Sequence, residues 1–291
     1  MPEPRLPDPL GSRRGHRSRD GAAALSTLSI ERLEPRLVST RFAGRGHHFE
    51  RVESTNDTLH GLARCGAPAG TFVLADGQTA GRGRRRRSWV SLPGKGLYLS
   101  VLFRPPPGPP TRWTLGAAVA ACDACHALGA ETVTIKWPND LLAGRDKLGG
   151  ILVETRSAGG AVDELIVGLG VNVHHDDAEI KSIGVRGVTS LHRAVPSGMV
   201  GSRTELAGAF LKRMDEVATS LEGGNWSAVA AAWLDRAPRA HGAPVSVSGV
   251  DGATWSGVSA GLAEDGALVV EDAAGQLRPV RQIEAVRFTE D

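Results

Sequence analysis

The chain has 291 residues, of which 41% are hydrophobic and 23% are charged, and its formal net charge is +2. These values are ordinary for a globular protein with one large domain or two unequal ones. Apolar runs stay well short of the roughly 18 residues of a membrane-spanning helix, and the polar N-terminus lacks the apolar stretch of a secretory signal. Residues 1–20, with five arginines and three acids, account for the whole excess of positive charge, so a uniformly basic surface that binds nucleic acid is not indicated.

The first forty residues predict little fixed structure. Residues 1–20 are rich in Pro, Gly, Arg and Ser, a composition typical of disordered segments. Residues 24–38 carry leucines at spacings that allow a short helix with Pro35 near its end. We therefore expect residues 1–42 to form an N-terminal extension that is largely disordered.

From residue 43 onward, strand-like and helix-like patterns follow one another. We expect strands at 49–52, 71–75, 97–103, 132–135, 148–154 and 164–173, and helices at 54–64, 113–128, 204–221 and 226–234. Ser54 is a candidate N-cap of its helix, with Asp57 as the partner in a capping box. The segment 76–96 holds five glycines and five arginines and is predicted to be a long polar loop.

After Pro238 the pattern changes to short alternating segments. They run from residue 244 to residue 288 and are separated by turn signals such as Asp251-Gly252. This pattern predicts a small β-barrel appended to an α/β core. We therefore expect a catalytic domain at 43–242 and a C-terminal domain at 243–291.

The chain has three cysteines, Cys65, Cys122 and Cys125. A low, odd count fits a reducing cytoplasm better than a disulfide framework. Cys122 and Cys125 form a C-x-x-C pair, but they lie within an apolar helical run and have no second pair or histidines to complete a zinc site. We therefore predict a structural role for these two cysteines and a cytoplasmic location for the protein.

The most distinctive motif is the glycine–arginine segment from Gly81 to Trp89. It is neither a dinucleotide fingerprint, because Arg86 stands at the third glycine position, nor a Walker A loop. Glycines let backbone N–H groups approach phosphate, and arginines neutralise phosphate with forked donors. A solvated basic run is the alternative interpretation, and this motif alone leaves both open.

Other polar motifs interrupt the apolar strands. The sequence Lys136-Trp137-Pro138-Asn139-Asp140 is either a turn or a site in which Asp140 helps to hold Mg²⁺. Lys147 opens an apolar strand that continues through Gly149-Gly150 to Glu154, an arrangement that lets an anionic ligand lie on bare backbone. The run 168–173 carries two glycines and one amide. Ser54-Thr55-Asn56 stands at the start of a helix, where a simple capping role is the alternative to ligand binding.

Taken together and in this order, these motifs closely resemble the biotin–protein ligase family. The resemblance runs from about Arg51 to Val173, and the C-terminal segment is similar to the family's SH3-like domain. It implies an α+β fold: a class II aminoacyl-tRNA-synthetase-like catalytic domain, with a mixed sheet packed with helices, plus a small SH3-like β-barrel. It also implies a ligase that uses biotin, ATP and Mg²⁺ to form biotinyl-5′-AMP and then modifies a lysine of a biotin carboxyl carrier domain of an acyl-CoA carboxylase.

The resemblance also implies roles for individual residues. Those expected to bind the biotin end are Ser54, Thr55 and Asn56. Gln78 matches the family's glutamine before the glycine loop and is expected among the ligand-binding residues. Those expected to contact biotin, the adenylate or the phosphate are Arg82, Gly83, Arg84, Trp89, Lys147, Gly150 and Asn172, with Arg84 retaining the reactive adenylate. Arg84, Lys147 and Asp140 are the expected catalytic residues. Asp140 is the candidate either for holding the metal ion or for activating the incoming lysine.

One residue departs from the family pattern, because Arg86 stands where the family usually has glycine. We expect this side chain to change the dynamics of the loop rather than the activity. The alternatives are a lipoate or octanoate ligase of related fold, a non-catalytic biotin-binding module, and a bifunctional ligase that also represses a biotin operon. The short, proline-rich N-terminal segment shows no helix-turn-helix pattern, which argues against DNA binding. The sequence does not predict the oligomeric state.

Overall fold

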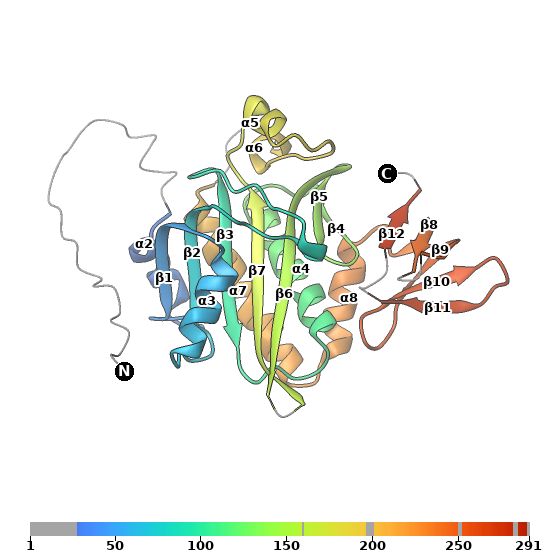
Figure 1. Cartoon of the computed structure of the whole chain (residues 1–291), viewed down its shortest axis with the longest axis horizontal. Coiled ribbons are helices and arrows are strands. Elements are labelled where there is room, and N and C mark those ends of the chain that lie inside the picture. Colours follow the sequence, from blue (N-terminus) through green and yellow to red (C-terminus); the bar gives the residue numbers. More distant parts are fainter. Residues whose placement is uncertain (1–27, 159, 196–200, 250–251, 282–284, 290–291) are drawn as a thin grey trace, which may run out of the picture.

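The computed structural model describes residues 28–158, 160–195, 201–249, 252–281 and 285–289. Its helices and strands, labelled as in Figure 1, are α2 (Ile30–Leu37), β1 (Gly46–Val52), α3 (Thr55–Arg64), β2 (Phe72–Gln78), the 3-10 turn η1 (Arg84–Arg86), β3 (Gly96–Phe103), α4 (Pro110–Ala127), β4 (Val133–Lys136), β5 (Asp140–Ala143), β6 (Asp146–Ala158), β7 (Ala161–Asn172), α5 (Asp177–Ser182), α6 (Leu191–Ala194), α7 (Arg203–Glu222), α8 (Trp226–Arg236), β8 (His241–Ser248), β9 (Thr254–Leu262), β10 (Leu268–Asp272), β11 (Leu277–Val280) and β12 (Ala285–Phe288).

A seven-stranded mixed sheet forms the centre of the molecule (Figure 1). Its strand order is β1-β2-β3-β7-β6-β5-β4. Strands β1 and β2 are parallel, and every other neighbouring pair is antiparallel. The mixed sheet packed with helices confirms the fold class predicted from the sequence.

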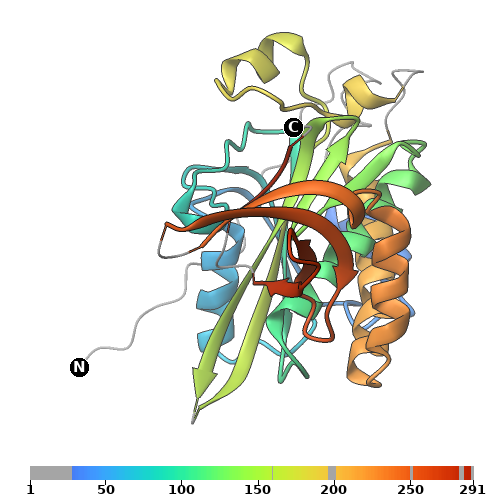
Figure 2. The ribbon, with the colours of Figure 1, turned by 90° about the vertical axis from the view of Figure 1, so that its right-hand side faces the viewer.

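Helices cover both faces of this sheet, as the side view in Figure 2 shows. Helices α4, α7 and α8 lie on one face and α2 packs on α7, whereas α3 lies on the other face against β2, β3 and β7. Alternation along β2 explains the two layers: Phe72 and Leu74 join the large core, and Val73 packs with Leu59 under α3. Among the described residues, no helix is long and apolar enough to cross a membrane.

The C-terminal strands form a second, antiparallel sheet with the order β11-β10-β9-β8-β12. This sheet agrees with the small β domain expected near the C-terminus, and its first strand, β8, begins at His241. It contacts the rest of the chain next to the β4–β5 turn. There the indole of Trp137 donates to the carbonyl of Gly266 at 3.2 Å, and Arg112 pairs with Glu264 at 2.6 Å.

Two local expectations differ from the structure. The segment after Pro138 is not only a turn, because residues 140–143 form strand β5, whose residue Asp140 pairs with Lys136. The capping box is wrong: Ser54 is the N-cap of α3 but its side chain makes no capping hydrogen bond. Asp57 instead forms an ion pair with Arg82, a partner that sequence spacing along one helix cannot reveal.

The N-terminal extension is the third difference. Residues 28–42 are part of the folded core, because Leu33, Leu37 and Phe42 are fully buried and α2 packs on α7. The expected helix is confirmed, whereas the expectation of disorder is wrong for residues 28–42. The apolar face of one short helix was too weak a signal to predict packing on α7, which begins more than 160 residues later. Residues 1–27 lie outside the described residues.

The C-x-x-C pair is buried in α4, which supports its predicted structural role. Burial raises the pKa of the Cys122 thiol to about 12 and raises that of Cys125 above its ordinary value, whereas Cys65 is exposed. Because the thiolate is the reactive form, we expect a thiol reagent at about pH 8 to label one cysteine in the folded protein and three after denaturation. A Cys65→Ser variant should lose the native labelling. Rapid native labelling of that variant would contradict the prediction.

Candidate active site

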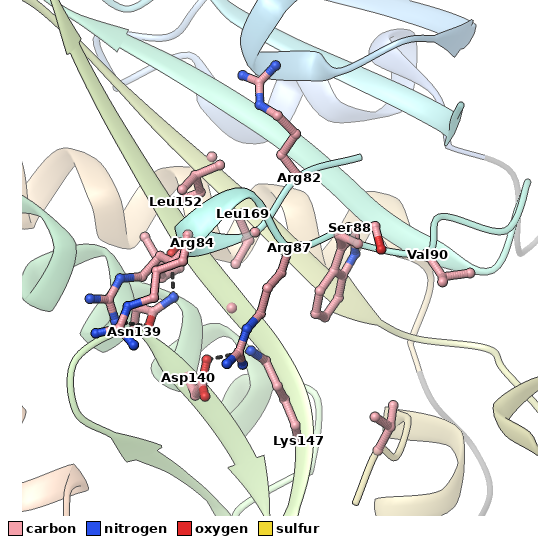
Figure 3. Close-up of a pocket in the computed structure, with 18 of the residues that line it drawn as sticks. Arg82, Arg84, Arg87, Ser88, Val90, Asn139, Asp140, Lys147, Leu152 and Leu169 are labelled. Atoms are coloured by element: carbon pink, nitrogen blue, oxygen red, sulfur yellow. Dashed lines mark hydrogen bonds and ion pairs between the residues drawn. The ribbon is translucent and has the colours of Figure 1, made fainter. Parts of the chain in front are cut away.

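A cavity of about 740 Å³ opens where α3, the glycine–arginine loop, the β4–β5 turn and the strands β6 and β7 meet (Figure 3). All the site residues predicted from the sequence line it, although they come from segments more than 100 positions apart. They are Ser54, Thr55, Asn56, Gln78, Arg82, Gly83, Arg84, Trp89, Asp140, Lys147, Gly150 and Asn172. The fold therefore brings the separate motifs together into one site.

Buried polar side chains form one end of the cavity. The backbone N–H of Thr55 and its hydroxyl both donate to Oε1 of Gln78, at 2.9 and 3.2 Å. Asn56 is held from two sides: its Nδ2 donates to Glu154 at 2.7 Å, and its Oδ1 accepts from Ser100 at 2.6 Å. This end can offer fixed donors and acceptors to a polar ring.

Glycines of β7 create the room for two of the side chains in the cavity. A Cβ at Gly168 would collide with Oδ1 of Asn56, and one at Gly170 would lie 2.9 Å from Nε1 of Trp89. At Gly150 the nearest atom would be 3.5 Å away, which is ordinary contact. The two glycines of β7 are therefore needed for the packing of Asn56 and Trp89 on the sheet.

The glycine–arginine loop folds back on itself and is held at both ends. The N–H of Trp89 donates to the carbonyl of Gly81 at 2.8 Å, and that of Gly83 donates to Arg87 at 2.7 Å. Between these bonds, Arg85 and Arg86 both adopt positive φ angles, of 56° and 58°. Such angles are rare for residues other than glycine. The conformation at 86 therefore explains why a glycine would be suited to that position.

Two arginines of this loop point in different directions. Arg84 reaches the β4–β5 turn, where its Nη1 donates to Oδ1 of Asn139 at 3.1 Å. Burial, with a smaller effect of Arg85, lowers the pKa of the Arg84 guanidinium from its ordinary value. Arg82 points away from this cluster (Figure 3) and pairs with Asp57 and Glu154. Arg84 thus reaches across the cavity, and Arg82 anchors the loop to α3 and β6.

Lys147 and Asp140 form an ion pair in the cavity, with Nζ 2.6 Å from Oδ1. The ammonium group of Lys147 also lies 5.6 Å from the centre of the Trp89 ring. The backbone of Lys147 is fixed by a bridge to Val188, so the segment between α5 and α6 forms one wall of the cavity. Lysine, aspartate and tryptophan from three elements therefore meet at one point.

A magnesium ion would find one protein ligand here. Asp140 is the only carboxylate among the described residues that line the cavity. Within the described parts of the chain, no group of three His, Cys, Asp or Glu side chains could hold a metal by itself. Mg²⁺ is usually bound by one or two carboxylates together with substrate phosphates, so this donor set fits an ion that arrives with a nucleotide.

Two buried groups in the cavity have unused hydrogen-bonding capacity. Asn172 donates through Nδ2 to the carbonyl of Thr189 at 3.0 Å, but its Oδ1 has no partner among the described residues. The indole Nε1 of Trp89 likewise has none within the described part of the chain. Buried polar groups are normally paired, so these two atoms are candidate ligand contacts.

The sequence analysis did not assign several residues to the site. Asn139 lies inside one quoted motif and Glu154 ends another, so both could have been included as polar residues of those motifs. Ser100 lies in an apolar strand and gave no signal. Neither did Val286 and Arg287 of β12, which line the cavity only because the C-terminal sheet packs beside the β4–β5 turn.

Comparisons with known proteins agree with this site. The model of the biotin/lipoate A/B protein ligase family matches residues 48–172. The biotin–[acetyl-CoA-carboxylase] ligase of Paracoccus denitrificans is 32% identical over 250 residues, which cover 80% of this chain and 97% of the relative. The chain belongs to the biotin protein ligase family. The matched segment contains the predicted motifs from Ser54 to Asn172.

Other members of the biotin protein ligase family differ in length or in sequence. The bifunctional ligase/repressor BirA of Bacillus spizizenii is 42% identical over 149 residues, covering 49% of this chain and 45% of the relative. This chain thus spans about half the length of the first curated relatives that it matches. A biotin protein ligase from Aquifex aeolicus, solved with biotin and ATP, has a TM-score of 0.71 at 24% identity and covers 84% of this chain and 99% of its own. At that identity the likeness supports the fold.

Proposed function

We propose that this chain attaches biotin to a lysine of a biotin carboxyl carrier domain through biotinyl-5′-AMP. Family membership supports this function. The observation that carries it is the cavity itself, which joins a buried hydrogen-bonding end around Thr55 to a cationic end at Arg84 and Lys147. A polar ring that bears a carboxylate chain fits such a cavity from one end to the other.

In the first half-reaction, a carboxylate oxygen of biotin attacks the α-phosphorus of ATP and pyrophosphate leaves. Negative charge gathers where the two anions meet. Lys147 and Arg84 line that end of the cavity, and preorganised cations lower the barrier by stabilising this charge. Mg²⁺, held by Asp140 and the phosphates, would supply further neutralisation of the triphosphate. This mechanism requires no covalent intermediate with the enzyme.

In the second half-reaction, the lysine amine of the carrier attacks the acyl carbon, and AMP leaves. The amine must lose a proton, and Asp140 is the carboxylate in the cavity that could receive it. Asp140 is bound to Lys147 in this structure, so its role requires that Lys147 turn to the phosphate. The loop closes the cavity by the contact between Arg84 and Asn139, and this closure keeps water from the mixed anhydride.

The remaining contacts follow from the same arrangement. Ser54, Thr55, Asn56 and Gln78 would bind the ring of biotin, with Gly150 leaving space for its chain. Asn172 and Trp89 offer one buried acceptor and one buried donor, which suit the edge of a purine. Arg82 is the exception among the predicted ligand contacts, because its side chain is bound to Asp57 and Glu154.

The deciding experiment is incubation of the full chain with biotin, Mg-ATP and a carrier domain, followed by mass measurement of the carrier. We expect the mass of the carrier to rise by one biotinyl group at a single lysine. We also expect biotin, but neither lipoate nor octanoate, to drive ATP–pyrophosphate exchange. Lipoate and octanoate are the matched controls. An unmodified carrier, or exchange driven by lipoate in place of biotin, would refute the proposal.

A Gly168→Ala substitution tests the buried end of the cavity around Thr55, Asn56 and Gln78, which we call the ring end. The new methyl group would collide with Asn56, which Glu154 and Ser100 hold in place. Overpacking of this kind costs about 1–3 kcal/mol, so we expect the KM for biotin to rise about 5- to 150-fold. Gly61→Ala on α3 meets open space and is the control. An unchanged KM in Gly168→Ala would contradict the assigned position of Asn56.

We propose that the chain acts as a ligase alone, in the cytoplasm, with residues 43–242 as its catalytic unit and 243–291 as its C-terminal domain. Between residues 28 and 45 the structure describes a single helix, α2, and this helix is used in packing on α7. A helix-turn-helix needs two helices, one of them free to enter DNA. A gel shift with a biotin-operon promoter tests the absence of DNA binding.

Three free cysteines agree with a reducing compartment.

A further inference from the structure

Glu154 on β6 connects two parts of the proposed active site without lining the cavity itself. Its Oε2 accepts from Nδ2 of Asn56 at 2.7 Å. Both of its carboxylate oxygens accept from Nη2 of Arg82 at 2.9 Å. One side chain therefore holds an amide at the ring end of the cavity and an arginine at the base of the loop.

An ionised carboxylate can only accept hydrogen bonds, and this property determines the orientation of Asn56. The NH₂ group of Asn56 must face Glu154, so its Oδ1 must face Ser100. The single hydroxyl proton of Ser100 is within reach of Oδ1 of Asn56 at 2.6 Å and of the Thr55 hydroxyl at 2.8 Å. Because Oδ1 cannot donate, the shorter contact takes this proton, and the Thr55 hydroxyl must supply its own proton to a neighbour.

The chain of hydrogen bonds continues to the other side of the ring end. The hydroxyl of Thr55 lies 3.2 Å from Oε1 of Gln78, and Nε2 of Gln78 donates to Ser91 at 2.8 Å. The donations thus run in two directions from the contact between Ser100 and Thr55. On the Ser100 side they run through Asn56 toward Glu154, and on the Thr55 side through Gln78 toward Ser91. The amide orientation of Asn56, which geometry alone leaves ambiguous, is decided by the acceptor-only group at the start of the chain.

The surroundings keep Glu154 ionised. Burial opposes its charge, but His60, whose Nε2 lies 3.7 Å from Oε2, the hydrogen bond from Asn56 and the charge of Arg82 hold the pKa of Glu154 at about 2. His60 also binds Glu164 at 2.7 Å, and Glu164 pairs with Arg104 at 2.6 Å. Glu164 therefore shares the charged environment but is not among the hydrogen-bond partners of Asn56.

We propose that Glu154 is a positioning residue that sets the direction of the hydrogen bonds with which the ring end of the cavity recognises biotin. This inference rests on the proposed function. A ureido ring presents two N–H donors and one carbonyl acceptor, so its affinity depends on which groups of the pocket accept and which donate. A neutral amide at position 154 would let the chain of hydrogen bonds reverse, while its carbonyl could still accept from Arg82.

The test is calorimetric titration of biotin into the purified full chain. We expect Glu154→Gln to raise the Kd for biotin about 10- to 100-fold, because a buried amide is left mismatched. The kcat at saturating biotin should change less than about 3-fold. In an Asn56→Ala background, Glu154→Gln should have little further effect on the Kd, since Glu154 acts through Asn56. A purely structural role predicts equal effects in both backgrounds.

Glu164→Gln is the matched control, because it removes a charge from the same cluster and should leave the Kd for biotin within about 2-fold. If Glu154→Gln does not fold, Ser100→Ala interrupts the same chain of hydrogen bonds, and the Kd should still rise. An unchanged Kd in both variants, or additive effects with Asn56→Ala, overturns the inference and leaves the proposed function standing. If the unmodified chain does not bind biotin, both proposals fail.

Discussion

Replacement of Lys147 by methionine is expected to lower biotin-dependent ATP–pyrophosphate exchange by about 10²- to 10³-fold, the usual cost of removing one preorganised charge from a transition state. The ammonium group lies 2.6 Å from Asp140 and beside the ring of Trp89, at the cationic end of the cavity. Methionine keeps the length of the side chain and removes the charge. The loss should therefore fall on kcat more than on folding.

The control for this experiment is Lys212→Met on the exposed side of α7, which removes the same charge far from the cavity. Exchange by that variant should match the unmodified chain. An Asp140→Asn variant separates two effects of Lys147, its contact with substrate and its restraint on Asp140. If Lys147 acts mainly by restraining Asp140, the double variant will be no worse than Asp140→Asn alone. Retention of more than about a third of the exchange activity by Lys147→Met would overturn the assigned role.

The ease with which this site could be predicted differs from one part to another. Motifs that carry their chemistry within a few residues could be recognised in the sequence, and Lys147 and Gly150 of one such motif line the same cavity as the other expected site residues. Strong apolar periodicity predicted the long strands β6 and β7 and the helix α7, because burial on one or two faces leaves a clear pattern. Strand β5 was missed, since its four residues follow a Pro-Asn-Asp sequence that also suits a turn.

Contacts between segments that are distant in the sequence could not be predicted from local patterns. Arg82 lines the cavity as expected of a ligand contact, but no local pattern indicated that its guanidinium pairs with Asp57 from α3 and Glu154 from β6. Likewise, nothing near Arg287 in the sequence indicates a cavity, and its position depends on how the C-terminal sheet packs near Trp137. Such partners are set by the tertiary fold, and each side chain's surroundings have to be known before its role can be assigned.

The second large effect is expected for Arg84→Ala, which should release biotinyl-5′-AMP into solution about 100-fold faster. Arg84 is the loop residue whose side chain reaches the β4–β5 turn, through Asn139 at 3.1 Å. Loss of a charge-assisted hydrogen bond and of a cation near the phosphate removes about 3 kcal/mol from the closed state. A chase experiment with labelled adenylate measures the release rate directly. Equal release from Arg84→Ala and the unmodified chain would refute this role.

Arg86→Gly is the matched variant on the same loop. Two opposing free-energy terms decide whether it slows or speeds the release of the adenylate. A residue with a side chain at a φ of 58° costs about 1–2 kcal/mol relative to glycine. Glycine in turn loses about 0.5–1 kcal/mol more backbone entropy when the loop orders. The balance favours the closed loop slightly, so adenylate release should slow about 2- to 5-fold, with transfer to the carrier preserved. Faster release would mean that the Arg86 side chain stabilises closure, and identical closure and release kinetics would show that it does not affect the loop.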